Sequence, residues 1–304
     1  MTAVDRRGAL LVFGSAAVWS FGGVIARFLT VADSWSVIFW RSLCAAVFLL
    51  GFMLAREGRA GTLRLFQATG WAGVTVGACF ATASTCFVVA LGYTTVANIL
   101  LMQAGAPLFA ALAGAILFRE RIGVATWLAI LAVIAGVAIM VSNALAGRVS
   151  PIGDGLALLM AVAVAAATVL TRRHANVGMM PAVFLGTVMA ATVGGFMAGQ
   201  LQVGARDAAL LFMFGALNLG LGMALFVTGA RLLPAAIAAL IGVTEPVLGP
   251  VWVWLVHGEV PSGRTLLGGA VVVCALLLHL VWQFRGATHA GAQGRARGGM
   301  WPLK

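Results

Sequence analysis

Residues 242–259 read GVTEPVLGPVWVWLVHGE, and residues 103–120, which lie 139 positions earlier, read QAGAPLFAALAGAILFRE. Two residue types keep their places without a gap: Pro107 aligns with Pro246, and Glu120 aligns with Glu259. Each stretch is almost uncharged and sits in an apolar run long enough to cross a bilayer, which takes about 20 residues. The shared Pro and Glu at one offset indicate that the two stretches are copies of one transmembrane element.

The rest of the chain has the composition of a membrane protein. Of its 304 residues, 62% are hydrophobic and only 9% are charged, and the mean hydropathy is +1.07. Soluble domains carry roughly 25% charged residues. Apolar runs separated by charge and turn residues predict ten spans, at 8–29, 35–54, 68–91, 95–118, 123–142, 153–171, 180–201, 208–230, 234–256 and 264–284.

Ten spans with a repeat of five predict an all-α integral membrane protein built as an inverted repeat. Five is an odd number, so the second copy enters the membrane from the opposite side, an arrangement typical of transporters. We expect a first five-helix half over 1–148 and a second over 149–284. The polar, Gly-rich residues 285–304 are expected to form a disordered cytoplasmic tail.

The charges predict the orientation. The net charge of +11 is the difference between 19 Lys and Arg residues and 8 Asp and Glu residues. Apart from Arg41, the Lys and Arg residues sit at the ends of the apolar runs or outside them. Placing the N-terminus inside leaves fourteen of them on that side and four on the other, so both termini are expected to be cytoplasmic, in the inner (plasma) membrane. This distribution argues for a lipid bilayer rather than nucleic acid as the partner of the positive charge.

The motifs resemble the EamA-type branch of the drug/metabolite transporter superfamily. The resemblance rests on Glu245-Pro246-Val247 with Gly258-Glu259, on the echo at Ala106-Pro107 and Arg119-Glu120, and on the Arg-containing stretch Trp40 to Ala46. It implies a secondary transporter that exports small metabolites such as amino acids, aromatic ones included, by alternating access between the halves. One departure is that Ala106 stands where the second copy has Glu245.

Two charged residues lie inside the predicted spans. Glu245 lies about eleven residues into its span, roughly 16 Å deep, so its carboxylate must face protein or water. It is interpreted either as a substrate-amine partner or proton-coupling group, or as a polar anchor at the proline kinks. Arg41 lies nearer the outer face, where it can bind a carboxylate, pair with another residue, or extend to the interface.

Further polar and aromatic side chains complete the predicted substrate site. Together with Arg41 and Glu245, the expected contacts are Trp19, Thr82, Gln103, Asn218 and Trp252. Buried amides are costly without partners, which favours Gln103 and Asn218. Structural roles are expected for five residues: Pro107, Pro246 and Pro250 as kinks, and Glu120 and Glu259 as caps of the helices that follow them.

The sequence gives little support to other classes of function. No Walker motif is present, no cofactor or metal site is expected, and the four cysteines form no CxxC pair. An intramembrane enzyme needs a second buried acid or base beside Glu245, and none was found. A channel-like facilitator or lipid scramblase remains the alternative to a carrier. We expect a monomer or a weak homo-oligomer that binds a small-molecule substrate.

Overall fold

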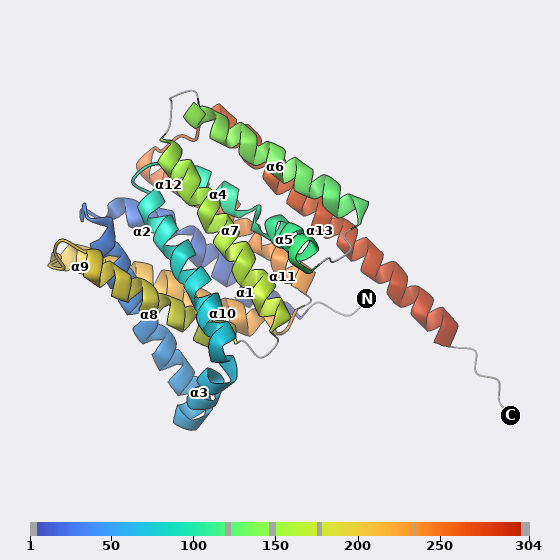
Figure 1. The fold of residues 1–304 in the computed structure, drawn as a ribbon, viewed down its shortest axis with the longest axis horizontal. Coiled ribbons are helices and arrows are strands. Elements are labelled where there is room, and N and C mark those ends of the chain that lie inside the picture. The colour runs from blue at the N-terminus through green and yellow to red at the C-terminus, as the bar shows by residue number, and fades with distance from the viewer. Residues whose placement is uncertain (1–4, 119–122, 146–149, 175–177, 234, 299–304) are drawn as a thin grey trace.

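The computed structural model describes residues 5–118, 123–145, 150–174, 178–233 and 235–298. Across these residues the regular structure is helical, and no strand is present. The helices pack into one bundle, from which the end of α13 projects (Figure 1). In chain order they are α1 (Arg6–Ser20), α2 (Gly22–Phe28), α3 (Ser34–Ala90), α4 (Val96–Gln103), α5 (Ala106–Phe118), α6 (Val124–Leu145), α7 (Pro151–Arg173), α8 (Met179–Met197), α9 (Ala205–Phe212), the π-helix η1 (Met213–Leu221), α10 (Gly222–Ala230), α11 (Ala235–Gly242), α12 (Thr244–His257) and α13 (Gly263–Gly298).

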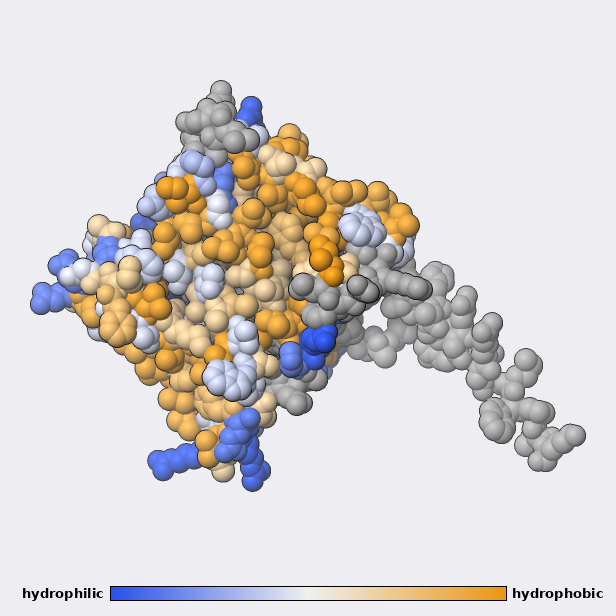
Figure 2. Space-filling model, in the orientation of Figure 1, coloured by the Kyte–Doolittle hydropathy of each residue, from blue (hydrophilic) through white to orange (hydrophobic). Residues whose placement is uncertain are grey.

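The bundle presents an apolar outer surface over its helices. Phe196 and Trp71 are 87% and 86% exposed, and many other large apolar side chains point outward. Figure 2 shows hydrophobic residues over most of the visible face and strongly hydrophilic ones at its margins. Nine helical segments of the described chain are long and apolar enough to cross a membrane, so the protein is a multi-pass membrane protein.

The count of nine depends on α3. Its 57 residues would extend about 85 Å as one straight helix, far more than a hydrocarbon core of roughly 30 Å. The backbone is interrupted at Gly58 and Gly70, where φ is 67° and 53°. Positive φ favours glycine, and the chain reverses at the lower end of α3 in Figure 1. The ten-span prediction therefore stays a prediction that requires α3 to supply two spans.

The predicted repeat is visible in two broken helices. The pair α4 and α5 is interrupted after Gln103, and the pair α11 and α12 is interrupted after Gly242, which is the same position at the offset of 139. A proline lacks the N–H for the residue four positions earlier and clashes with its carbonyl. For Pro107 that residue is Gln103, and for Pro246 it is Gly242. The helix is thus interrupted four residues before each of these two prolines, which were predicted to be kinks, and the missing N–H explains the position.

Pro250 behaves differently from the other two prolines. It lies inside α12, which continues through it to His257. The helix is therefore not broken at Pro250, and the predicted kink there stays a prediction.

The elements of the two halves interleave. α1 packs against α10 and α12, while α3 packs against α7 and α8. α6 and α13 approach so closely that a Cβ added to Gly136 would lie 2.7 Å from the carbonyl oxygen of Gly268. Small residues permit such close helix packing in membranes.

The end of the chain differs from the prediction. We expected disorder from Arg285 onward, whereas α13 continues as helix through Gly298. In Figure 1 this part of α13 extends away from the bundle. The apolar pattern ends before the helix does, which is why composition alone did not locate its end.

Asp33 begins α3 and connects it to the segment after α8. Its carboxylate accepts hydrogen bonds from the Trp35 N–H at 3.0 Å, the Ser36 hydroxyl at 2.8 Å and the Gly199 N–H at 3.2 Å. Burial raises the pKa of Asp33, but the hydrogen bonds from Ser36, Trp35 and Gly199 outweigh it and hold the pKa below its ordinary value.

Candidate functional site

A cavity of about 330 Å³ lies between helices of both halves. Its walls come from α1, α2, α3 and α4, from α7 and α8, and from η1, α10 and α12. Most of the lining is aliphatic or aromatic. The polar lining residues are Trp19, Arg41, Ser84, Gln103, Thr168, Thr171, Thr187, Asn218 and Glu245. Five of the seven predicted contacts therefore face one cavity: Trp19, Arg41, Gln103, Asn218 and Glu245.

Arg41 is buried in the wall of this cavity, with 6% of its surface exposed. Nη1 donates to the Ser84 hydroxyl at 2.7 Å, and the guanidinium carbon lies 4.3 Å from the centre of the Phe214 ring. Its Nε is buried without a hydrogen-bond partner, and no ion pair joins Arg41 to a described carboxylate. The side chain thus does not extend to the lipid interface, and its charge is available to an anionic group.

Glu245 faces the same cavity from the second residue of α12. It follows the break at Val243, where the first N–H groups of α12 have no partner within the helix. A carboxylate in the first turn is favoured by these N–H groups and the helix dipole. Among the described residues, no hydrogen bond or ion pair engages the Glu245 carboxylate. The site therefore holds a carboxyl group as well as a guanidinium.

Several other polar atoms around the cavity are buried without a protein partner. They are Trp19 Nε1, Gln103 Oε1 and Thr171 Oγ1. Most buried polar groups in native proteins are hydrogen-bonded, either to protein or to water. Orphaned groups gathered around one cavity indicate that a polar ligand or water completes their bonding.

Asn218 contributes mainly by holding the backbone at the break between α1 and α2. Its Nδ2 donates to the carbonyls of Val18 at 2.6 Å and Trp19 at 3.3 Å. It lies in the π-helix η1, a type of distortion that is frequent at functional sites. A Cβ on Gly22 would lie 3.0 Å from Asn218 Oδ1, so a small residue is needed there.

Two predicted substrate contacts lie elsewhere. The Thr82 side chain is exposed and bonds back to the Ala78 carbonyl at 2.9 Å, so it points away from the cavity. Trp252 donates to the Ser20 hydroxyl at 3.1 Å and stacks on Phe21 with centroids 5.2 Å apart. Thr82 was placed on the wrong face of α3, and the indole of Trp252 is used in packing.

The sequence reasoning also missed a residue of the site. Ser84, two positions after Thr82, lines the cavity and binds Arg41. A step of two residues turns a helix by about 200°, which moves a side chain to the opposite face. Ser84 could have been found from the helical phase of Phe80, Ala83 and Phe87, which share its face.

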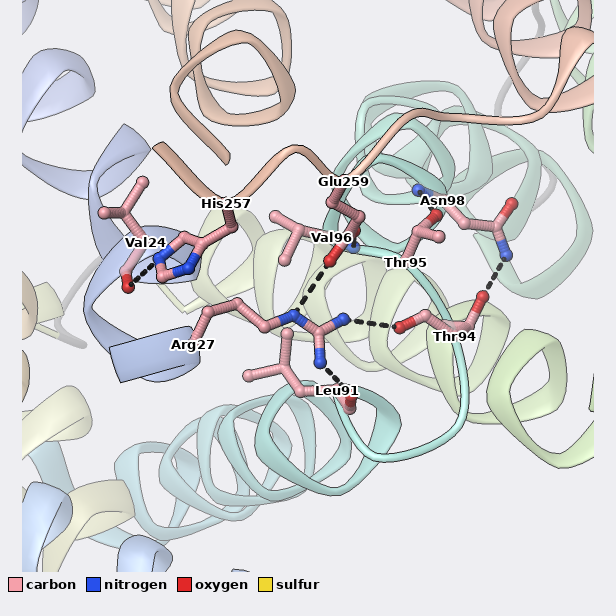
Figure 3. A network of polar contacts seen from close by, with 9 residues as sticks. All are labelled: Val24, Arg27, Leu91, Thr94, Thr95, Val96, Asn98, His257 and Glu259. Atoms are coloured by element: carbon pink, nitrogen blue, oxygen red, sulfur yellow. Dashed lines mark hydrogen bonds and ion pairs between the residues drawn. The ribbon is translucent and has the colours of Figure 1, made fainter. Parts of the chain in front are cut away.

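One end of the bundle is closed by a set of polar contacts that we call the closure network (Figure 3). Arg27 pairs with Glu259 through Nε and Oε2 at 2.9 Å, and also donates to the carbonyls of Leu91 at 2.8 Å and Thr94 at 3.1 Å. Its members are Val24, Arg27, Leu91, Thr94, Thr95, Val96, Asn98, His257 and Glu259. The contacts join α2 and α4 of the first half to the end of α12 in the second.

Within this network, Glu259 corrects a prediction. It was expected to cap the helix that follows it, but Oε1 accepts from the N–H of Val96 at 2.7 Å. The helix N-terminus that it binds is therefore that of α4, across the boundary between the halves. Glu120, its counterpart in the repeat, lies outside the described residues.

The cavity and the closure network occupy different levels of the bundle. No member of the network lines the cavity, whereas Thr171, in the last turn of α7, and Met179, the first residue of α8, both do. The cavity thus extends toward the end where α7 finishes. The network lies at the end where α7 begins, because Gly153 packs against Thr94 and Tyr93.

The comparisons with known proteins agree with this arrangement. No curated protein matches the chain. One crystal structure, titled only as that of a protein, shares the fold with a TM-score of 0.64 at 18% identity, over 90% of this chain and 97% of that chain. The model of the EamA-like transporter family matches twice, over residues 6–142 and 151–281. The two matches cover nearly the whole chain, once for each half, and the protein therefore belongs to the EamA-like transporter family of the drug/metabolite transporter superfamily.

Proposed function

We propose that this protein is a secondary transporter that exports amino acids and binds them as zwitterions in the cavity. The observation that carries the proposal is that two groups of opposite charge face one cavity and neither has an ion-pair partner among the described residues. Arg41 offers an unpaired guanidinium and Glu245 an unpaired carboxyl group to the same space. A buried charge needs a partner of opposite sign. An α-ammonium and an α-carboxylate provide both partners in one small molecule.

The remaining lining favours an apolar or aromatic side chain on the substrate. Phe80, Phe87 and Phe226 line the cavity together with Met223 and Leu100. The volume of about 330 Å³ lies at the lower end of the range of roughly 300–1,000 Å³ found for small-molecule sites. Trp19 Nε1 and Gln103 Oε1 supply a donor and an acceptor that can orient the ligand.

The charge distribution supports export as the proposed direction of transport. With the Arg-rich ends in the cytoplasm, both termini are inside and the closure network faces outward. The cavity then opens toward the cytoplasm, which is the loading state of an exporter. Alternating access would open the closure network and close the end near Thr171. Such rocking of one repeat against the other is the usual mechanism in inverted-repeat transporters.

Binding of analogues that lack one charge tests the zwitterion site. Purified protein is mixed with phenylalanine, with phenethylamine, which lacks the carboxylate, and with 3-phenylpropionate, which lacks the ammonium group. Ligand binding to the native state raises the melting temperature. Only phenylalanine should give a large shift, and Arg41→Gln and Glu245→Gln should each remove it.

Thr82→Ala is the matched control, because its side chain lies on α3 but faces away from the cavity. It should keep the full shift. Equal shifts with all three ligands, or an unchanged shift in Arg41→Gln, would refute the zwitterion site.

Counterflow in proteoliposomes distinguishes a carrier from a channel-like facilitator or scramblase. Unlabelled phenylalanine inside the vesicles should accelerate uptake of labelled phenylalanine by a carrier. A pore gives no such trans-stimulation, and its absence would reject alternating access.

A further inference from the structure

Asp154 is a second buried acid, and the proposed transport site does not use it. It lies in the first turn of α7 and is only 3% exposed. Its Oδ1 accepts a hydrogen bond from Asn98 Nδ2, while Oδ2 is buried without a partner among the described residues. Asp154 stands at the start of the predicted span 153–171, and the fold encloses it.

Asn98 also has a buried acceptor oxygen without a hydrogen-bond donor among the described residues. It is 3% exposed, and Nδ2 donates to both Asp154 Oδ1 and Thr94 Oγ1, the latter at 3.1 Å. Its Oδ1 is buried and has no donor. Two bonded side chains therefore each keep one bare acceptor oxygen. An unpaired acceptor in a buried site is costly, and an uncompensated buried charge more so.

A single proton resolves both deficiencies. When a proton from water adds to Oδ2, the Asp154 carboxyl becomes a neutral donor and acceptor. Its O–H can then donate to Asn98 Oδ1 while its Oδ1 accepts from Asn98 Nδ2. This acid–amide pair has two hydrogen bonds and no net charge.

Among the described residues, no other charged group forms a hydrogen bond or ion pair with Asp154. α7 packs against α3, α4, α5 and α6, and the described parts of α4, α5 and α6 contain no Asp, Glu, His, Lys or Arg. Gly153 lies against Thr94 and Tyr93, and of these two only Tyr93 is titratable. The other charged groups to consider are Arg41, which lies in the cavity wall, the pair Arg27 and Glu259, the charges at the turn of α3 (Arg56, Glu57, Arg59 and Arg64), and Arg172 and Arg173 at the far end of α7. Arg148, before α7, lies outside the described residues.

The pair is connected to the closure network. Asn98 holds the Thr94 side chain, and the Thr94 carbonyl accepts from Arg27 Nη2 at 3.1 Å. Figure 3 shows these contacts one after another, from Asn98 to Thr94, from Thr94 to Arg27 and from Arg27 to Glu259. Fixing α7 to Asn98 thus fixes the backbone carbonyl that holds Arg27.

We propose that Asp154 and Asn98 form a proton-binding site that stabilises the closed state of the closure network. The proposal rests on the proposed transport function in that closure and opening of this end are steps of the cycle. A ligand shifts a two-state equilibrium only through its different affinity for the two states. The closed state binds the proton between two bare oxygens, whereas water solvates them in the open state. Protons therefore favour closure, and deprotonation favours opening.

Infrared difference spectroscopy tests the site without any substrate. A protonated carboxyl group gives a carbonyl stretching band that a carboxylate lacks. The wild-type protein should show a buried carboxylic-acid band that titrates with pH and is lost in Asp154→Asn. The same component should remain in Glu245→Gln, which separates it from any signal of Glu245.

Asn98→Ala provides a second variant and a different readout. Removing the amide removes both hydrogen bonds of the pair, so the Asp154 band should move to higher frequency rather than vanish. This variant also serves if Asp154→Asn fails to fold.

Two results of the infrared measurement would overturn the proposal. One is a band that survives in Asp154→Asn without loss of a component. The other is a wild-type protein with no titrating component besides that of Glu245, because Asp154 would then not exchange a proton. The phenylalanine binding assay does not depend on this outcome, so the two proposals fail separately.

Discussion

Replacing Glu259 with Gln is expected to weaken the closure network while keeping its shape. The amide keeps an oxygen that can accept from the Val96 N–H, but removes the charge that pairs with Arg27 at 2.9 Å. Hydrogen bonds to charged groups contribute about 1.5–3 kcal/mol. The two side chains are 29% and 18% exposed, so solvent screens part of the interaction. We take about 1.5 kcal/mol, which corresponds to about a tenfold change in the ratio of closed to open protein.

Hydrogen exchange at residues 91–98 measures this change. These residues carry the backbone groups that Arg27 and Glu259 bind, so their amides exchange when the network opens. We expect exchange about tenfold faster in Glu259→Gln than in the wild type.

The matched control is Glu57→Gln, which removes the other described ion pair. Glu57 pairs with its neighbour Arg56 at 3.5 Å, and their side chains are 40% and 39% exposed. This pair joins no separate elements, so its loss should leave exchange at residues 91–98 unchanged. Equal acceleration in both variants, or none in Glu259→Gln, would refute the role of the ion pair in closure.

Three further predictions concern stability and the cavity. Because the native pKa of Asp33 is lowered, its ionised form stabilises the native state above about pH 3.9, and this stabilisation is lost as pH falls through the lower native pKa. Asp33→Asn should therefore reduce the loss of stability on the acid side of a stability–pH curve. An unchanged acid side would contradict this. A Cβ on Gly222 would lie 2.2 Å from Trp19 Nε1, so Gly222→Ala should push the indole and weaken phenylalanine binding about tenfold, whereas Gly242→Ala, with open space around it, should not. Pro246→Ala restores the N–H that can bond the Gly242 carbonyl, so it should join the broken helix and slow counterflow without lowering the melting temperature; unchanged counterflow would argue against a role for the break.

The features that the sequence predicted well are those with local causes. A proline acts on the carbonyl four residues before it, so the positions of Pro107 and Pro246 were enough to place both breaks. Arg41 and Glu245 were recognisable because a charge inside an apolar run must face protein or water. Burial of Glu245 could therefore be inferred without knowledge of the packing, whereas for Arg41 extension to the interface stayed an alternative.

The features that it missed depend on contacts between distant segments. Glu259 binds Val96, 163 residues away, and its closeness in sequence to the next helix suggested a different partner. Asp154 is buried because α7 packs against other helices, among them α4, whose Asn98 lies 56 residues away in sequence and binds it. Thr82 and Ser84 differ only in which face of one helix meets the bundle. Such choices are made by tertiary packing, which no local pattern contains.

The broken helices also bear on how the two halves arose. A homodimer of one five-helix unit presents every side chain twice, related by its symmetry axis. Glu245 occurs only once, because the first copy has Ala106 at that position. A dimer of identical chains cannot place a lone acid on one side of its axis. Joining two copies in one gene removes this constraint, so that each copy can mutate on its own and the centre can distinguish one end of a ligand from the other.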